Sequence, residues 1–337
     1  MPFSSMTSMI RWVLITLEPS TISFVQNEMT SSTLSSLISS ISLAMIRSPS
    51  LKVGSIEPDS TVRGILPNRL GTPLFLSDVN TIIVPIDWDK ISNKDKIDPA
   101  NMGYAFDPDN TYSVPYFVGS VGILYDTNVV DEEDLSEGWE LLRNPKYAGN
   151  IYMYDSERDS FMIALKSLGY SMNTTDKDEI TEAYNWLIDQ REKMDVVYVG
   201  DDVMDNMISG NKAIAVVYSG DGAYIMAEND DLEYFEPEEG TNEWCDAMVI
   251  TKSCVDTDLA EEFMDYMLEY DVVYQNSLFV GYTTPITEVR EDFKVDEYDG
   301  ISAYTPNFGA PNNEIFGYQE EDIRAFYSDL WTKVKAY

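Results

Sequence analysis

The most informative run in the chain is Glu239-Gly240-Thr241-Asn242-Glu243-Trp244-Cys245-Asp246-Ala247-Met248-Val249-Ile250. It begins as a polar loop and continues into an apolar run that is typical of a buried strand. Side chains two positions apart in a strand point to the same face, so Trp244 and Asp246 are predicted to stand side by side. A tryptophan face and a carboxylate suit a desolvated organic cation, because the ring attracts it through its quadrupole and the carboxylate through its charge. The alternative interpretation is a core tryptophan beside a surface aspartate.

Length and charge restrict the classes of protein to consider. The chain has 337 residues, which is enough for two domains, and a net charge of −37. Such a surface repels nucleic acid and anionic lipid and attracts cations. The charge is uneven, since residues 1–80 hold five basic and five acidic side chains and the whole excess therefore lies in residues 81–337. We expect no nucleic-acid partner.

The chain has no histidine and two cysteines, Cys245 and Cys254. The commonest general base and the commonest metal ligand are therefore missing, and two cysteines are too few for a zinc site. No glycine-rich nucleotide loop and no calcium loop is present either. We predict no cofactor, no metal and no catalysis. Two buried free thiols are favoured over a Cys245–Cys254 disulfide.

Residues 1–80 differ in composition and hydrophobic pattern from the rest of the chain. Residues 1–60 contain sixteen serines, and no clear period of a helix or strand runs through them. The apolar run 12–17 is too short to span a bilayer, and no clear signal peptide or lipoprotein cleavage motif is present. We interpret this segment as weakly structured or partly folded.

From residue 81 onward, predicted strands alternate with predicted helices, which favours an α/β fold with a mostly parallel sheet. Ligands of such sheets bind beyond the carboxyl ends of the strands. The candidate site residues therefore follow strand ends. They are Asp155, Ser156 and Asp159 after the strand 151–154, Tyr218 and Asp221 after the strand 213–218, and Gly281-Tyr282-Thr283 after Leu278-Phe279-Val280, which we read as a strand.

The acidic turn Asp155-Ser156-Glu157-Arg158-Asp159 has two interpretations of equal weight. Its side chains could stabilise the N-terminus of the helix that follows, where carboxylates meet the helix dipole. Alternatively, Asp155, Ser156 or Asp159 binds a ligand, because the turn follows a strand.

Four motifs in sequence order resemble the polyamine-binding proteins of ABC importers, the spermidine/putrescine type. The motifs are Tyr112-Ser113-Val114-Pro115-Tyr116 with Gly122-Ile123-Leu124-Tyr125, the acidic turn with Ala164-Leu165-Lys166-Ser167-Leu168-Gly169-Tyr170-Ser171-Met172-Asn173, the Trp244-Cys245-Asp246 element, and Gly281-Tyr282-Thr283-Thr284-Pro285. Each motif alone is weak, but their order is fairly specific. The resemblance covers about residues 81–337.

The resemblance implies a role for each matching position. Trp244 would stack on the methylene chain of the polyamine, and Asp246 would pair with an ammonium group. In the acidic turn, Asp159 matches a glutamate of the family and Ser156 matches an aspartate, with Asp155 just before it; the serine loses one charge. The remaining implied contacts are an aromatic wall from Tyr218, a lining residue in Tyr282, and a hydrogen bond from Gln319.

The fold implied by the resemblance is the two-lobed, type II periplasmic-binding-protein fold, with lobes joined by crossover hinge strands. We expect residues 81–121 and 245–290 to belong to the first lobe, and 122–244 and 291–337 to the second. The first lobe is expected to be incomplete or altered, because residues 1–80 lack the "NWxxY" loop and "PSxY" turn of the family. A misplaced start, a frame error or a rearranged gene would explain this, and re-reading the coding DNA in all frames would test it.

The function implied is capture of putrescine or spermidine outside the cytoplasm and delivery to the permease subunits of an ABC importer, by a monomeric protein. Three alternatives remain open. The chain could bind another solute with the same fold, such as a sugar or an iron complex. It could hydrolyse a substrate with a pair of carboxylates. With an altered first lobe, it could also bind nothing.

Overall fold

The structure is a computed structural model and describes residues 12–18, 21–26 and 83–336 of the chain. The described residues form two compact units. The first contains residues 119–244 and 294–336, and the second contains the described residues up to 118 together with residues 245–293. Two strands carry the chain from one unit into the other, namely β4, Val114–Asp126, and β9, Glu243–Thr251.

The sheet of the first unit is mixed. Strand β5, Ile151–Tyr154, pairs in parallel with β6, Val197–Val199, and with β7, Ile214–Tyr218. Strand β4 pairs antiparallel with β7 and with β8, Leu232–Phe235. The expectation of a mostly parallel sheet is therefore wrong, because β4 enters from the other unit and runs against the strands of the βα units.

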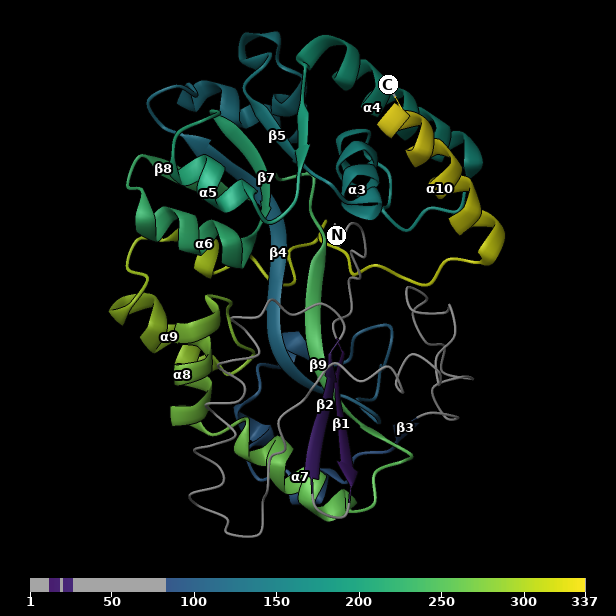
Figure 1. Ribbon diagram of the computed structural model, residues 1–337, viewed down its shortest axis with the longest axis vertical. Helices are drawn as coiled ribbons and strands as arrows, with labels where there is room; N and C mark the ends of the chain where they lie inside the picture. Colours follow the sequence, from purple (N-terminus) through teal and green to yellow (C-terminus); the bar gives the residue numbers. More distant parts are fainter. Residues whose placement is uncertain (1–11, 19–20, 27–82, 337) are drawn as a thin grey trace. The chain divides into compact units, whose positions relative to one another are not determined.

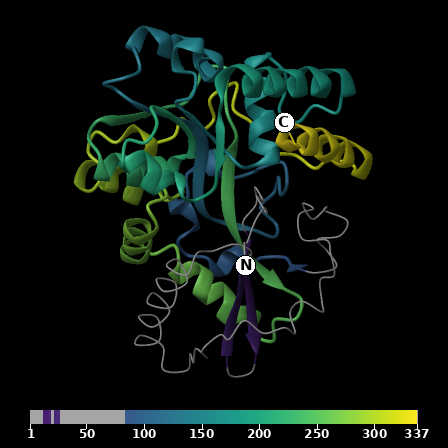
Figure 2. The same ribbon diagram turned by 45° about the horizontal axis from the view of Figure 1, so that its top comes forward.

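Helices of the first unit form two groups (Figure 1). Helices α3, Glu157–Ser167, α4, Lys177–Met194, and α10, Glu321–Ala336, contact one another, and α5, Val203–Ile208, contacts α6, Ser219–Glu228. The same grouping can be followed after a turn of 45° (Figure 2). The 3₁₀ segments of this unit are the long Glu132–Arg143 and the short Pro145–Tyr147 and Ser302–Tyr304. The apolar spacing of residues 161–168 and 180–187 predicts α3 and α4, and both predictions are confirmed.

The beginning of α3 is determined by a serine. Ser156 is the N-cap residue in extended conformation, and its Oγ accepts a hydrogen bond of 3.2 Å from the backbone N–H of Asp159. That bond satisfies one of the N–H groups that a helix leaves without an intrahelical partner. The helix ends before Gly169, which has φ +79°, a conformation that glycine adopts without steric cost.

Replacing Ser156 by alanine is expected to lower the free energy of unfolding by about 1 kcal/mol, because the N-cap bond of α3 is lost. Urea unfolding of the free protein measures this effect. Ser136→Ala is the control, since the Ser136 hydroxyl is exposed and donates only to Glu133 O. If Ser156→Ala unfolds like the wild type, the capping role is contradicted.

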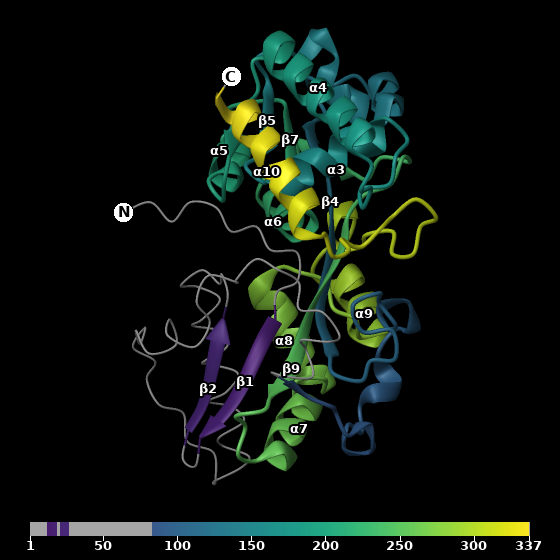
Figure 3. The same ribbon diagram turned by 90° about the vertical axis from the view of Figure 1, so that its right-hand side faces the viewer.

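The second unit is built on β9. Strand β1, Trp12–Glu18, pairs in parallel with β9 and antiparallel with β2, Thr21–Gln26, and the short β3, Ile83–Val84, pairs antiparallel with β9 (Figure 3). The interpretation of the first eighty residues as weakly structured or partly folded found no strand period in these two segments, which nevertheless form β1 and β2. The pairing of β1 with β9 is a tertiary interaction, which the local period of residues 12–18 does not report. The rest of that prediction lies outside the described residues.

The helices of the second unit are α7, Thr257–Tyr266, α8, Tyr270–Val280, and α9, Thr287–Asp296, which continues past the boundary between the units. The short 3₁₀ segments are Trp88–Lys90, Lys94–Lys96 and Pro99–Asn101. The interpretation of 278–280 as a strand is wrong, because these residues are the last turn of α8. Gly281 ends that helix with φ +80°. A short apolar run does not by itself distinguish a strand from the end of a helix.

Both cysteines are free thiols, as expected, but only Cys245 is buried and Cys254 is half-buried. Burial raises the pKa of the Cys245 thiol, and the nearby charge of Asp246 adds to this effect. Among the described residues, none of the helices combines the length and the apolar character needed to cross a bilayer.

Candidate functional site

Two tyrosines mark the carboxyl ends of neighbouring strands in the first unit. Tyr154 is the last residue of β5 and Tyr218 is the last residue of β7. Because these strands pair in parallel, their ends meet at one edge of the sheet. The two rings have centroids 5.0 Å apart and an interplanar angle of 70°, which is an edge-to-face contact.

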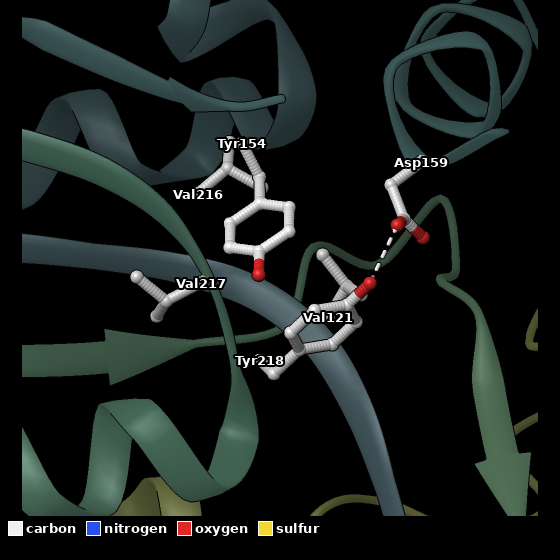
Figure 4. A pocket seen from close by; sticks show the side chains of 6 residues that line it. All are labelled: Val121, Tyr154, Asp159, Val216, Val217 and Tyr218. Carbon is white, nitrogen blue, oxygen red and sulfur yellow. Dashed lines mark hydrogen bonds between the residues drawn. The ribbon is translucent and has the colours of Figure 1, made fainter. Parts of the chain in front are cut away.

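The carboxylate of Asp159 faces this aromatic pair from the first turn of α3. It is 1% exposed, and its Oδ2 accepts a hydrogen bond of 2.8 Å from the Tyr218 hydroxyl (Figure 4). Its Oδ1 accepts a longer bond of 3.4 Å from Asn242 Nδ2. The cap at Ser156 determines where α3 begins and thereby directs Asp159 toward the strand ends.

A narrow, partly open recess lies beside Asp159, and it has no room for a water molecule (Figure 4). Its lining combines aromatic rings, aliphatic side chains and one carboxylate: Val121, Tyr154, Asp159, Val216, Val217 and Tyr218. An apolar wall with a single negative charge suits the end of a hydrocarbon cation.

Trp244 extends the aromatic surface of the first unit. It is buried, and its ring is perpendicular to that of Tyr218, with centroids 6.4 Å apart. Gly119 of β4 makes room for the indole, because a Cβ at position 119 would lie 2.3 Å from Trp244 Cζ2. The close approach of backbone and ring fixes the position of Trp244.

The electrostatic state of Asp159 is unusual. Burial raises the pKa of this carboxyl above its ordinary value, while the Ser156 and Tyr218 bonds, the charge of Arg158 and the Asn242 bond oppose the rise. In the described part of the chain, no lysine or arginine nitrogen lies within 4.0 Å of the carboxylate. The Arg158 guanidinium instead donates to Gly317 O and lies over the ring of Phe316, 4.2 Å from its centroid. Asp159 is therefore a buried carboxylate without an ion-pair partner among the residues that the structure describes.

The other members of the acidic turn have structural partners. Asp155 is exposed and forms an ion pair of 2.7 Å with Lys335 of α10, and the hydroxyl of Ser156 is used by the helix cap. Only Asp159 among the three lines the recess. Gln319 is half-buried in the segment that leads to α10, and its role stays a prediction.

Two predicted residues, Asp246 and Tyr282, belong to the second unit. Asp246 is half-buried in β9, and its charge adds to burial in raising the pKa of Tyr116. Tyr282 is 8% exposed and directly follows Gly281 at the end of α8. Their part in binding stays a prediction.

Sequence reasoning missed Tyr154, Asn242 and Gly119. A strand-end position was a usable signal for Tyr154, since the same signal selected Tyr218. Asn242 lies two residues before Trp244, so the strand period extended backwards would have placed it on the same face. Nothing in the local sequence around Gly119 shows that an indole 125 positions later needs its missing Cβ.

Solved structures define the class of this fold. The spermidine/putrescine ABC transporter substrate-binding protein PotD from Streptococcus pneumoniae has a TM-score of 0.76 at 27% identity, covering 89% of this chain and 95% of that one. The Tp0655 lipoprotein of Treponema pallidum has a TM-score of 0.71 at 19% identity, covering 96% of this chain and 99% of that one, and it supports the fold alone. The fold is that of a type II periplasmic binding protein, as expected.

Residues 75–303 match the family described as bacterial extracellular solute-binding protein, and the chain belongs to this family. The spermidine/putrescine-binding periplasmic protein of Salmonella typhimurium is 28% identical over 259 residues, which is 76% of this chain and 72% of that protein. The Escherichia coli protein of the same name is also 28% identical, over 258 residues, with the same two coverages of 76% and 72%. The resemblance inferred from the four motifs is confirmed.

Proposed function

We propose that this chain is the extracytoplasmic binding subunit of an ABC importer and that it captures a polyamine for the permease subunits in the membrane. The family, and the names of the Salmonella, Escherichia coli and Streptococcus relatives, support this proposal. The protein acts by binding, without catalysis and as a monomer.

The observation that carries the proposal is the state of Asp159. A buried carboxylate without an ion-pair partner is costly, because burial removes its hydration and no cation in contact with it replaces that hydration. An ammonium group of a ligand supplies that charge. The hydroxyl of Tyr218 already donates to Oδ2, so the carboxylate is oriented before the ligand arrives.

The aromatic side chains account for the rest of the ligand class. The rings of Tyr154, Tyr218 and Trp244 lie close together in the same unit. They attract an ammonium through their faces and cover the methylene groups next to it. A free metal cation has no methylene groups for the rings to cover. Asp246 and Tyr282 are the further contacts that the family resemblance assigns to the ligand.

Calorimetric titration of the purified chain with putrescine and with spermidine tests the proposal. We expect saturable binding with one ligand per chain at an ionic strength of about 0.15 M, where loose attraction to the acidic surface is screened. Binding that stays weak, unsaturated and sensitive to salt would mean general charge attraction and would refute the proposal.

The affinity is expected to fall at acidic pH. A bound ammonium favours the ionised form of Asp159, so the protein must release a proton from this carboxyl whenever the free site is protonated. Because burial raises the pKa of Asp159, the loss begins above the ordinary range of aspartate and approaches about tenfold per pH unit below that pKa. Titrations at successive pH values measure this, with Asp155→Asn as the control that keeps the profile. An affinity that is constant into the ordinary aspartate range would contradict the role of Asp159.

A further inference from the structure

Asn242 is a fully buried amide held next to the candidate site. Its side chain is 0% exposed, and it lies in the first unit directly before β9. Its backbone is fixed on both sides, because Glu314 N donates to Thr241 O at 3.0 Å and Glu243 N donates to Glu314 O at 2.8 Å. The position of the amide is therefore set by the loop that pairs with Glu314, independently of any ligand.

The nitrogen and the oxygen of the Asn242 side-chain amide have different environments. Nδ2 donates to Asp159 Oδ1 at 3.4 Å, and Oδ1 is buried without a hydrogen-bond partner in the described part of the chain. The orientation follows from chemistry, since an ionised carboxylate only accepts and must face the NH₂ end. A buried carbonyl oxygen left without a donor destabilises a protein, so it calls for an explanation.

We infer that Asn242 is a ligand-selecting residue whose carbonyl oxygen, together with the Asp159 carboxylate, forms a two-acceptor site for a primary ammonium group. This inference rests on the proposed function and specifies the kind of amine end that the site prefers. A primary ammonium carries three N–H donors, which is more than one oxygen of Asp159 can accept. The bond from Nδ2 also holds the amide beside the carboxylate, so the two acceptors belong to neighbouring side chains.

An unpaired amide oxygen alone does not make a site, as Gln190 demonstrates. Gln190 of α4 is also fully buried, and its Oε1 also lacks a partner among the described residues, while Nε2 donates to Leu142 O at 3.1 Å. None of its hydrogen bonds involves a carboxylate. Asn242 differs because its neighbour is the one acidic side chain that lines the recess. Gln190 therefore provides the matched control.

The test compares two ligands with the same charge and the same chain length, putrescine and its N,N,N′,N′-tetramethyl derivative. Each end of putrescine has three N–H donors, whereas each end of the derivative has one, which Asp159 alone can accept. Asn242→Leu keeps the approximate volume and removes both polar atoms. We expect Asn242→Leu to lower the affinity for putrescine by about 10- to 100-fold, which is the range for a hydrogen bond to a charged group. The affinity for the derivative is expected to change by less than about twofold.

Two further variants separate binding from structure. Gln190→Met removes an equally buried amide and is expected to leave both affinities unchanged. Asn242→Asp keeps an acceptor and loses the donor, and at pH 8 we expect it to bind putrescine within about tenfold of the wild type. Thermal unfolding of each free variant confirms that it is folded.

Three outcomes overturn the inference. The first is that Asn242→Leu lowers the affinity for both ligands equally. The second is that Asn242→Leu leaves the affinity for putrescine unchanged, and the third is that Asn242→Asp binds putrescine as poorly as Asn242→Leu does. If the wild type binds neither ligand, the proposed function fails and this inference fails with it. Wild-type binding combined with any of the three outcomes overturns the role of Asn242 alone.

Discussion

Replacing Asp159 by asparagine is expected to lower the affinity for putrescine and spermidine by at least about 100-fold, because removal of one partner from a buried charge pair leaves the other unpaired. The substitution keeps the shape of the side chain and its ability to accept from Tyr218. Calorimetric titration of wild type and variant measures the loss.

Asp159→Asn is expected to lower the affinity without lowering the stability of the free protein. Burial raises the pKa of Asp159, so the ionised carboxyl destabilises the fold as pH rises through that pKa. Asp159→Asn removes this cost, and the melting temperature at neutral pH should equal or exceed that of the wild type without ligand. A loss of affinity with unchanged or higher stability identifies a binding residue, whereas a loss of both identifies a structural one.

Asp155→Asn is the matched control for this experiment. The two aspartates are four positions apart, but Asp155 is exposed and paired with Lys335. Exposed ion pairs contribute little, so we expect the affinity to change by less than about threefold. Equal effects of the two substitutions would show that the net charge of the turn, and not the position of Asp159, attracts the ligand.

Gly119→Ala is expected to have the second largest effect, acting on both stability and binding. The added Cβ would lie 2.3 Å from Trp244 Cζ2 and 2.8 Å from Ser219 Oγ, so the indole must move. Forcing an extra carbon into a packed region costs about 1–3 kcal/mol. Since Trp244 then loses its position beside Tyr218, polyamine affinity should fall by about tenfold or more.

Chemical denaturation and titration of the same Gly119→Ala sample measure the two effects. Gly200→Ala is the control, because a Cβ at position 200 meets its nearest neighbour at 3.9 Å, an ordinary contact. A Gly119→Ala protein with wild-type stability and affinity would show that the indole has room to move and is not a fixed wall of the site.

The sequence predicted correctly the elements that depend on local interactions, and it failed where an element depends on contacts between distant parts of the chain. Helices α3 and α4 were predicted because their apolar spacing is local, and the strand after Trp244 was predicted because its apolar run is long. The last turn of α8 was misread because three apolar residues carry too short a period. Strand β1 was missed because its pairing with β9 joins segments more than 200 positions apart, and β2 was missed with it because it pairs with β1.

The candidate site was predicted in part. The strand-end rule and the family motifs selected Tyr218 and Asp159, which the structure brings into a direct hydrogen bond. Neither the rule nor the motifs selected Asn242, whose relation to Asp159 depends on how the loop before β9 is held by Glu314. The contacts assigned to Asp246, Tyr282 and Gln319 stay predictions.

The sequence by itself determined the family, the α/β class and a chemistry of binding without histidine, because these depend on composition and on local motifs. Tertiary structure alone decided which carboxylate of the acidic turn forms an ion pair and which is buried beside the strand ends. Asp155 is neutralised by Lys335, which is 180 positions away in the chain. Asp159 instead accepts hydrogen bonds from Tyr218 and Asn242, and it forms no ion pair with the lysines and arginines that the structure describes. The two residues are chemically identical, and only burial and the partners that folding supplies make one a surface ion pair and the other a candidate site.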